Sequence, residues 1–200
     1  MTCAIKNISR ALFLAAVLAS ASAAQATITV YNATLNGPNE SPPNASPGTG
    51  TATVTIDDVL NTMRVQVSFS GLTSGTTASH IHAATPTPFT GTAGVATTTP
   101  TFPGFPLGVT AGTYDNLFDL LAASTYNSAF VTANGGTTAS AEAALLAAIA
   151  QGRAYLNIHT SNFTGGEIRG FLVAVPEPAS WALMLLGFGA TGIALRRGIG

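Results

Sequence analysis

Apolar and polar residues alternate along much of the first half of this chain. Between residues 63 and 69, Met63, Val65, Val67 and Phe69 are separated by single polar residues. Successive side chains of an extended strand point to opposite faces, so this pattern predicts a strand with one buried face. The segment TATVTID (51–57) repeats the pattern with threonine on the polar side. Further strands are predicted at 28–35, 78–83, 154–159 and 167–173.

Two stretches break this alternation and predict helices. One is short, at 116–122, and the other spans 141–151. Ser140 precedes the longer helix as its expected N-cap, and Gly152 follows it as a stop signal. Apolar residues of the longer helix recur at helical spacing and form one stripe that faces the core. The stripe consists of Leu145, Leu146 and Ile149.

Turn-forming residues fill 38–50 and 85–112, which we interpret as two long loops on a single domain, 27–174. The expected fold is therefore mainly β, with half-buried antiparallel strands and one or two short helices. Three aromatic side chains of the second loop are expected to fasten it to the core, and an exposed binding patch is the alternative. They are Phe89, Phe102 and Phe105.

The first 26 residues have the pattern of a secretory signal peptide. Lys6 and Arg10 precede an apolar run, 11–18, and the segment closes on the small-residue motif Ala24-Gln25-Ala26. The apolar run is too short to cross the roughly 30 Å of hydrocarbon in a bilayer, which argues against a membrane anchor. We therefore expect export by the secretion machinery and cleavage by signal peptidase.

The C-terminal residues 175–200 form a second processing segment. A Pro-Glu-Pro triplet precedes an apolar stretch, 179–195, and two arginines follow it. Seventeen helical residues reach about 25 Å, barely enough for a transmembrane helix, and the arginines favour a cytoplasmic C-terminus. The triplet is Pro176, Glu177 and Pro178, and the arginines are Arg196 and Arg197.

This tail resembles the PEP-CTERM sorting signal, because the triplet, the apolar span and the basic end occur together. The resemblance implies recognition and cleavage by an exosortase in a Gram-negative bacterium, after transient anchoring in the inner membrane. It also implies release or attachment at the outer surface, with exopolysaccharide as an expected partner. A plain C-terminal anchor is the alternative, and both interpretations place the domain outside the inner membrane.

Charge and cysteine content narrow the function further. Four of the seven basic residues belong to the two terminal segments, so residues 27–175 carry three arginines against seven acidic residues. A net charge of −4 without a basic cluster argues against nucleic-acid binding. The single cysteine, Cys3, lies in the signal segment, so the exported domain has no disulfide.

Three stretches of the domain together resemble the CHRD domain, which is named for its repeats in the animal protein chordin and also occurs in bacterial exported proteins. They are LNGPNESPPNASPGTGTATVTID, GLTSGTTASHIHA and AYLNIHTSNFTGGEIRGFL. The resemblance covers 29–173 and implies a β-sandwich of immunoglobulin-like or Cu/Zn-dismutase-like Greek-key character. It implies no established catalytic activity.

The chain contains three histidines, and strand alternation predicts that they share a surface. His80 and His82 flank the apolar Ile81, and His159 alternates with apolar residues in a second strand. If the strands at 78–83, 154–159 and 167–173 are neighbours, the face away from the core displays a polar cluster. Its members are His80, His82, Asn157, His159, Glu167 and Arg169.

Two imidazoles at positions i and i+2 of a strand are rooted about 6.6 Å apart, close enough to bind one metal ion. His159 from an adjacent strand completes three nitrogen ligands and leaves an open coordination position, which suits zinc or copper. Glu167 is then a fourth ligand or a hydrogen-bond acceptor for an imidazole. The alternative is a metal-free polar network, with Asn157, Thr160 and a Glu167–Arg169 pair, that holds the strands in register.

Other chemistry finds less support in the sequence. No nucleophile elbow, phosphate loop or dinucleotide fingerprint occurs. The Cu/Zn dismutase family also carries a His-x-His strand, but this chain lacks a fourth histidine and a disulfide, which argues against dismutation.

We therefore expect an exported, non-enzymatic module with an adhesive or structural role at the cell surface. A periplasmic or surface protein that binds copper or zinc through three histidines is the main alternative. Capture of a protein ligand, by analogy with chordin, is a third alternative that rests on fold alone.

Overall fold

The computed structural model describes residues 27–176. The expected signal peptide, 1–26, and most of the expected sorting signal, 177–200, lie outside the described residues. The described strands are β1 (Ile28–Asn36), β2 (Thr49–Asp57), β3 (Thr62–Ser70), β4 (Thr76–His82), β5 (Gly112–Asp119), β6 (Tyr155–Thr160), β7 (Ile168–Phe171) and β8 (Val173–Ala174). Two α-helices, α1 (Ser128–Ala133) and α2 (Thr138–Ala150), and two 3-10 helices, η1 (Gly37–Asn39) and η2 (Ala123–Thr125), complete the described part.

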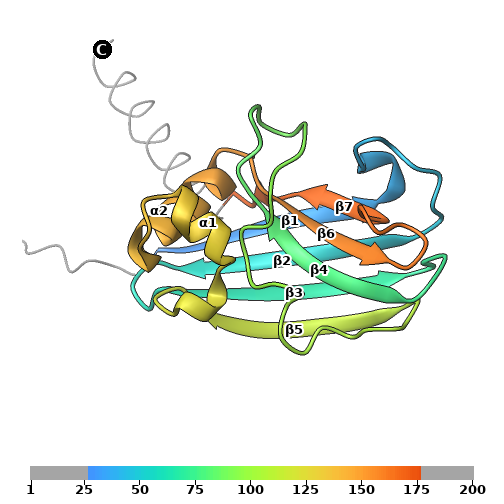
Figure 1. The fold of residues 1–200 in the computed structure, drawn as a ribbon, viewed down its shortest axis with the longest axis horizontal. Helices are drawn as coiled ribbons and strands as arrows, with labels where there is room; N and C mark the ends of the chain where they lie inside the picture. Colours follow the sequence, from blue (N-terminus) through green and yellow to red (C-terminus); the bar gives the residue numbers. More distant parts are fainter. Residues whose placement is uncertain (1–26, 177–200) are drawn as a thin grey trace, which may run out of the picture.

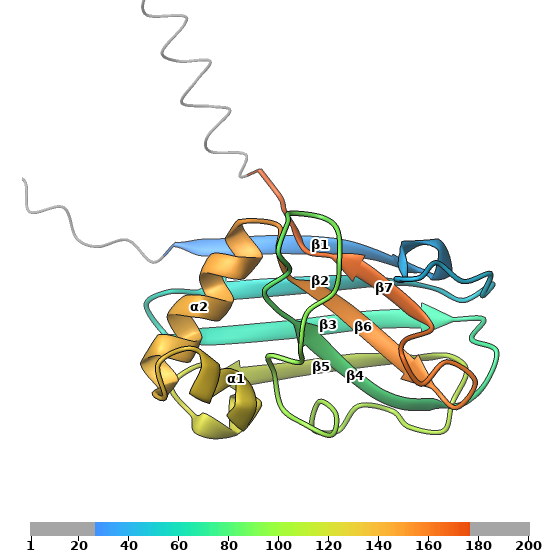
Figure 2. The same ribbon diagram turned by 45° about the horizontal axis from the view of Figure 1, so that its top comes forward.

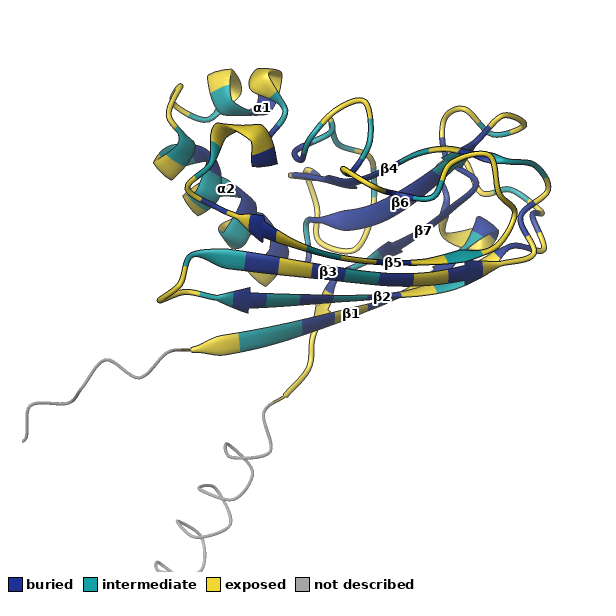
Figure 3. Cartoon of the chain, turned by 90° about the horizontal axis from the view of Figure 1, so that it is seen from below, coloured by how far each residue is buried: buried dark blue, intermediate teal, exposed yellow. Residues whose placement is uncertain are grey.

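The strands form one continuous antiparallel sheet that curls into two layers. Its order is β4-β6-β7-β1-β2-β3-β5, and β8 continues the line of β7 along β1. Seen edge-on, β1, β2, β3 and β5 make one layer and β4, β6 and β7 the other (Figure 3). The second layer runs obliquely across the first, and both helices pack at one end (Figures 1 and 2). The expected antiparallel, mainly β architecture is confirmed.

The core lies between the two layers and follows the predicted alternation. Every second residue of β3, from Met63 to Phe69, is buried, and the intervening side chains are more exposed. The second layer contributes Ile81, Leu156 and Ile158 from its inner face, and all three are fully buried. The apolar stripe of α2 closes one end, because Leu145 and Ile149 are buried against the same cluster.

The prediction of a helix at 116–122 is wrong, because β5 extends through residue 119 and η2 begins only at residue 123. Tyr114 and Phe118 alternate with exposed residues and point into the core, and the strand pairs with β3 in antiparallel register. Cross-strand pairing overrode the local preference that favoured a helix. The strand ends at Asp119, and η2 follows it.

The longer helix is present, but it starts earlier than predicted. Thr137, not Ser140, is the N-cap of α2, and Ser140 bonds back to it as the third residue of a capping box. Gly152 has a φ of +67° just after the helix, as expected of a residue that ends one. Helix α1 was not predicted from the sequence.

Loops cover the outer face of the β4-β6-β7 layer. The segment between β4 and β5, residues 83–111, rises over the ends of these strands (Figures 1 and 2). The helix η1 lies against the same layer, where the backbone carbonyl of its last residue, Asn39, accepts a hydrogen bond from Arg169. The polar face predicted from the sequence is therefore largely buried. Within residues 27–176 no helix is both long and apolar enough to cross a membrane.

Candidate metal centre

The three histidines converge under this loop cover. Strand β4 pairs with β6 and β6 pairs with β7, so the adjacency that the sequence argument required is present. One ring nitrogen from each of His80, His82 and His159 lies within 4.8 Å of the others. Ring centroids are separated by 5.3 to 5.8 Å. Nitrogens around a tetrahedral zinc ion lie about 3.4 Å apart, so small ring rotations bring these three into coordination range.

Backbone carbonyls hold one nitrogen of each ring. His80 Nε2 lies 2.6 Å from the carbonyl oxygen of Pro100, and His82 Nδ1 lies 2.9 Å from that of Ala93. His159 Nδ1 lies 2.9 Å from the carbonyl oxygen of Thr164. A carbonyl oxygen only accepts hydrogen bonds, so each of these nitrogens carries the proton. In a neutral imidazole the lone pair is then on the other nitrogen.

Those other nitrogens have no hydrogen-bond partner among the described residues. They are His80 Nδ1, His82 Nε2 and His159 Nε2, and all three atoms are buried. Unpaired acceptors inside a protein normally cost free energy, so three in one small space require an explanation. Hydrogen bonds from the ring N–H to backbone carbonyls fix the tautomer of each ring. Metal-binding histidines commonly make such hydrogen bonds with the nitrogen that does not bind the metal.

The electrostatic environment keeps the rings neutral. Burial lowers the pKa of His82 to about 4; the Ala93 hydrogen bond acts in the opposite direction, and the neighbouring imidazoles and Arg169 lower the pKa as well. Burial also lowers the pKa values of His80 and His159 below the usual range. At neutral pH all three lone pairs are therefore available to an ion.

Two further side chains, Tyr155 and Arg169, stack in sequence on the ring of His82. The Tyr155 ring lies parallel to His82, with centroids 4.9 Å apart, and the Arg169 guanidinium sits 4.6 Å above the centroid of Tyr155. Arg169 also donates to the carbonyl of Gly91, in the same loop as the Ala93 carbonyl. The alternation Tyr155-Leu156-Asn157 already placed Tyr155 on this face, but the sequence analysis did not select it.

The structure places Glu167 away from the histidines. Its side chain is fully buried, and its oxygens accept hydrogen bonds from Ser46 Oγ, the Thr73 backbone N–H and Thr160 Oγ1. Burial alone would raise the pKa of this carboxyl, but those hydrogen bonds together lower it. Glu167 precedes β7, so strand alternation does not extend to it, which is why the expected contact with an imidazole or with Arg169 is not made.

Arg169 pairs instead with Glu40, a residue that the sequence analysis did not single out. The guanidinium Nε lies 3.8 Å from Glu40 Oε2, and both side chains are almost completely buried. Burial raises the pKa of Glu40 to about 7, although Arg169 acts in the opposite direction. Glu40 comes from an irregular loop without periodicity, and no sequence signal would have placed it here.

Asn157 lies beside this pair. It sits opposite His80 on one side and opposite Arg169 on the other. Its Oδ1 and the Oε1 of Glu40 both lie within 3 Å of the point that a Cβ on Gly166 would occupy, and neither oxygen has a hydrogen-bond partner among the described residues. The structure therefore brings the predicted cluster residues together except for Glu167, and Glu40 and Tyr155 lie among them.

Of the sorting-signal residues, only Pro176 falls within the described part, where it is exposed. Glu177, Pro178, Arg196 and Arg197 lie outside it. A family model described as the CHRD domain matches residues 31–172, and one described as the PEP-CTERM protein-sorting motif matches residues 174–198. Searches of curated proteins and of solved structures found no match.

Proposed function

The chain belongs to the CHRD domain family, and from that premise we propose that it binds one copper or zinc ion through His80, His82 and His159. Its PEP-CTERM motif implies an exported protein that exosortase processes for the cell surface. The proposal rests on two observations: the three imidazoles each offer a ring nitrogen within 4.8 Å of the others, and each has one buried nitrogen without a hydrogen-bond partner among the described residues.

A metal-free network explains this arrangement less well. In such a network the ring nitrogens would bond to one another or to Asn157, and the cluster would be satisfied internally. Instead each ring donates its N–H to a backbone carbonyl, and the lone pair on its other nitrogen has no partner among the described residues. Each unsatisfied buried acceptor costs about 1–3 kcal/mol, which a bound ion would recover.

The donor set indicates which ions fit. Imidazole nitrogen suits zinc and copper, and a set of three leaves a coordination position for water or a small molecule. His80 would bind through Nδ1, and His82 and His159 through Nε2, because those are the nitrogens without a proton. The carbonyls of Pro100, Ala93 and Thr164 would hold the rings in this orientation.

Metal content of the purified protein tests the proposal. The protein, expressed as the full chain without a histidine tag, is expected to hold about one copper or zinc ion per molecule by elemental mass spectrometry. The His80→Ala/His82→Ala variant is expected to hold less than about a tenth of that amount, because one imidazole binds these ions weakly. Ser79→Ala is the matched control, since Ser79 is also buried in β4 and bonds to the Asn157 carbonyl.

Two results would contradict metal binding. One is a wild-type protein that contains neither ion and whose melting temperature does not change when copper or zinc is added. The other is an equal metal content in the wild type and the double variant.

A non-enzymatic adhesive or structural role at the cell surface is the second candidate, with exopolysaccharide as the partner. The combination of this domain with a surface-sorting motif supports it. The two candidates are compatible, because a metal centre can also hold a surface module in shape. Fractionation of cells tests the shared premise: most of the protein is expected outside the cytoplasm.

A further inference from the structure

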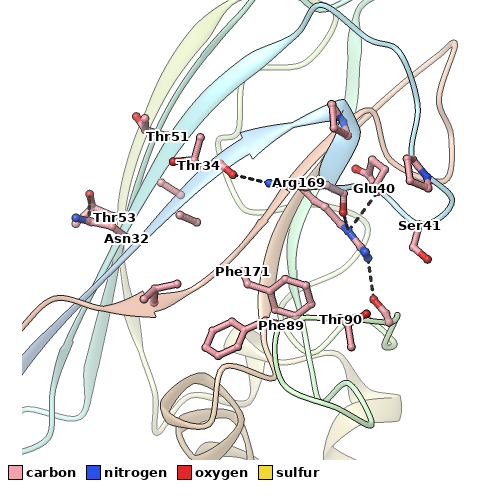
Figure 4. Close-up of a pocket in the computed structure, with 17 residues that line it drawn as sticks. Asn32, Thr34, Glu40, Ser41, Thr51, Thr53, Phe89, Thr90, Arg169 and Phe171 are labelled. Atoms are coloured by element: carbon pink, nitrogen blue, oxygen red, sulfur yellow. Dashed lines mark hydrogen bonds and ion pairs between the residues drawn. The ribbon is translucent and has the colours of Figure 1, made fainter.

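An open groove of about 940 Å³ lies over the outer face of β1 and β2, and Arg169 is among the residues that line it. Its floor is a patch of four polar side chains in register, because Asn32 lies opposite Thr53 and Thr34 lies opposite Thr51. Figure 4 shows these side chains at one side of the groove, with Glu40, Ser41 and Arg169 at another and two phenylalanines at its end. The floor thus offers hydroxyl and amide groups at the spacing of a β-sheet.

The aromatic end of the groove is built at a conformational cost. Phe89 has a φ of +59°, a left-handed conformation that bulky residues rarely adopt, and its side chain is 57 % exposed. Its backbone N–H donates to the Gly152 carbonyl, and its ring packs on Gly152 so closely that a Cβ there would lie 2.3 Å from Phe89 Cζ. The ring meets Phe171 edge to face at 6.1 Å. Strained backbone that presents an apolar ring to solvent is characteristic of binding sites.

The side of the groove formed by Glu40 and Arg169 carries one negative and one positive side chain, so it has no net charge. Glu40 and Arg169 form their buried ion pair at the edge of the groove, so the wall carries both signs together. Glu40 lines the groove and its Oε1 is buried without a hydrogen-bond partner among the described residues.

We propose that this groove binds a neutral oligosaccharide. A sugar ring offers an apolar face of C–H groups to Phe89 and Phe171, and it offers hydroxyls to Asn32, Thr51 and Thr53. The balanced wall favours a ligand without net charge, and the polar floor disfavours a lipid chain.

A peptide fits the groove less well. Extended peptides bind sheets by pairing with a free edge strand, and the edges of this sheet are β4 and β5. The groove instead lies on the face of β1 and β2; β2 is paired along both edges, and β1 is paired along its whole length with β2 and at Tyr31, Asn32 and Asn36 with β8 and β7. Side chains must therefore make the contacts with the ligand. Hydroxyl groups and aromatic rings on the face of a sheet are suited to bind a sugar.

The groove and the three histidines do not overlap, although Arg169 and Glu40 lie at both sites, so variants of Phe89 and Thr51 test the groove apart from the metal centre. None of the three histidines lines the groove, and none of the four floor residues contacts an imidazole nitrogen. A groove variant is expected to keep the metal content of the wild type.

Titration with defined sugars tests the proposal. The purified protein is titrated with hexasaccharides of glucose, xylose and mannose, by calorimetry and by amide NMR shift mapping. At least one is expected to bind and to shift the amides of residues 32–34, 51–53 and 89–91. Phe89→Ala is expected to weaken binding by about tenfold or more, from loss of the stacking surface.

Two further variants allow the proposal to be tested even if Phe89→Ala perturbs the fold. Thr51→Val removes an exposed hydroxyl that makes no side-chain hydrogen bond within the described part of the chain, and we expect binding to weaken by about threefold to tenfold. Leu117→Ala removes an exposed apolar side chain on β5, outside the groove, and is expected to leave binding unchanged.

Three outcomes would overturn the proposal. The first is no binding of any hexasaccharide at millimolar concentration. The second is binding that Phe89→Ala and Thr51→Val leave unchanged. The third is binding at these residues of a heparin fragment or a charged peptide in place of the neutral sugars.

Discussion

Glu167→Ala is expected to lower the free energy of unfolding by about 4 kcal/mol, a large part of the total for a domain of this size. The carboxylate is fully buried and ties three separate segments together through Ser46, Thr73 and Thr160. Alanine would leave those three donors without an acceptor, and the hydroxyls of Ser46 and Thr160 are buried away from water. Urea unfolding followed by circular dichroism measures the change.

Asp115→Ala provides the matched control. Asp115 also accepts three side-chain hydrogen bonds, two from Arg64 and one from Gln66, but the ion pair is about half exposed. Because solvent screens exposed pairs, its removal is expected to cost far less than removal of Glu167. Glu167→Gln keeps an acceptor oxygen and is expected to fall between the two. Equal losses for Glu167→Ala and Asp115→Ala would show that the buried network contributes no more than a surface pair.

Acid is expected to destabilise the metal-free protein through His82. The unfolded chain protonates this imidazole near its ordinary pKa of 6.5, whereas in the folded protein burial lowers the pKa to about 4. Below pH 6.5 the unfolded state therefore binds the extra proton, and stability falls until the folded pKa is passed. Between pH 7 and pH 4 this single group accounts for a loss of about 3 kcal/mol.

Comparison with His82→Phe isolates this effect. Phenylalanine keeps a ring beside Tyr155 but does not titrate. The neighbouring His80, His159 and Arg169 remain in both proteins, as does Glu40. The pKa of Glu40 is raised to about 7, so this carboxyl contributes in the opposite direction between pH 7 and about 4.5. Unfolding is measured in the presence of a chelator, and parallel pH curves for the two proteins would contradict the prediction.

The sequence predicted the strands more reliably than the helices. The alternation in 63–69 is a direct consequence of strand geometry, and the buried residues of β3 are the predicted ones. The stretch 116–122 shows the limit, because the same residues were compatible with a helix until β3 supplied pairing partners. Pairing depends on residues about fifty positions away, which a local pattern does not contain.

In the candidate site too, strand alternation predicted part of the arrangement and tertiary packing decided the rest. Alternation within single strands placed His80, His82 and Asn157 on one face, and the structure agrees, because a two-residue period survives wherever the strand is regular. The same rule failed for Glu167, which lies one residue before β7 begins. Its side chain turns toward Ser46, in the loop before β2, and Thr160, at the end of β6, and only the packing of these segments decided its direction.

The sequence by itself determined the broad class of this protein: a mainly β domain of the CHRD family, with a sorting motif after it and with histidines that alternate with apolar residues in two strands. Tertiary structure alone decided what surrounds those histidines. Loop carbonyls of Pro100, Ala93 and Thr164 fixed which nitrogen of each ring is free, and Glu40 joined Arg169 from an irregular loop. Periodicity is a property of neighbouring residues, whereas burial and the choice of hydrogen-bond partner arise only when distant loops close over the sheet.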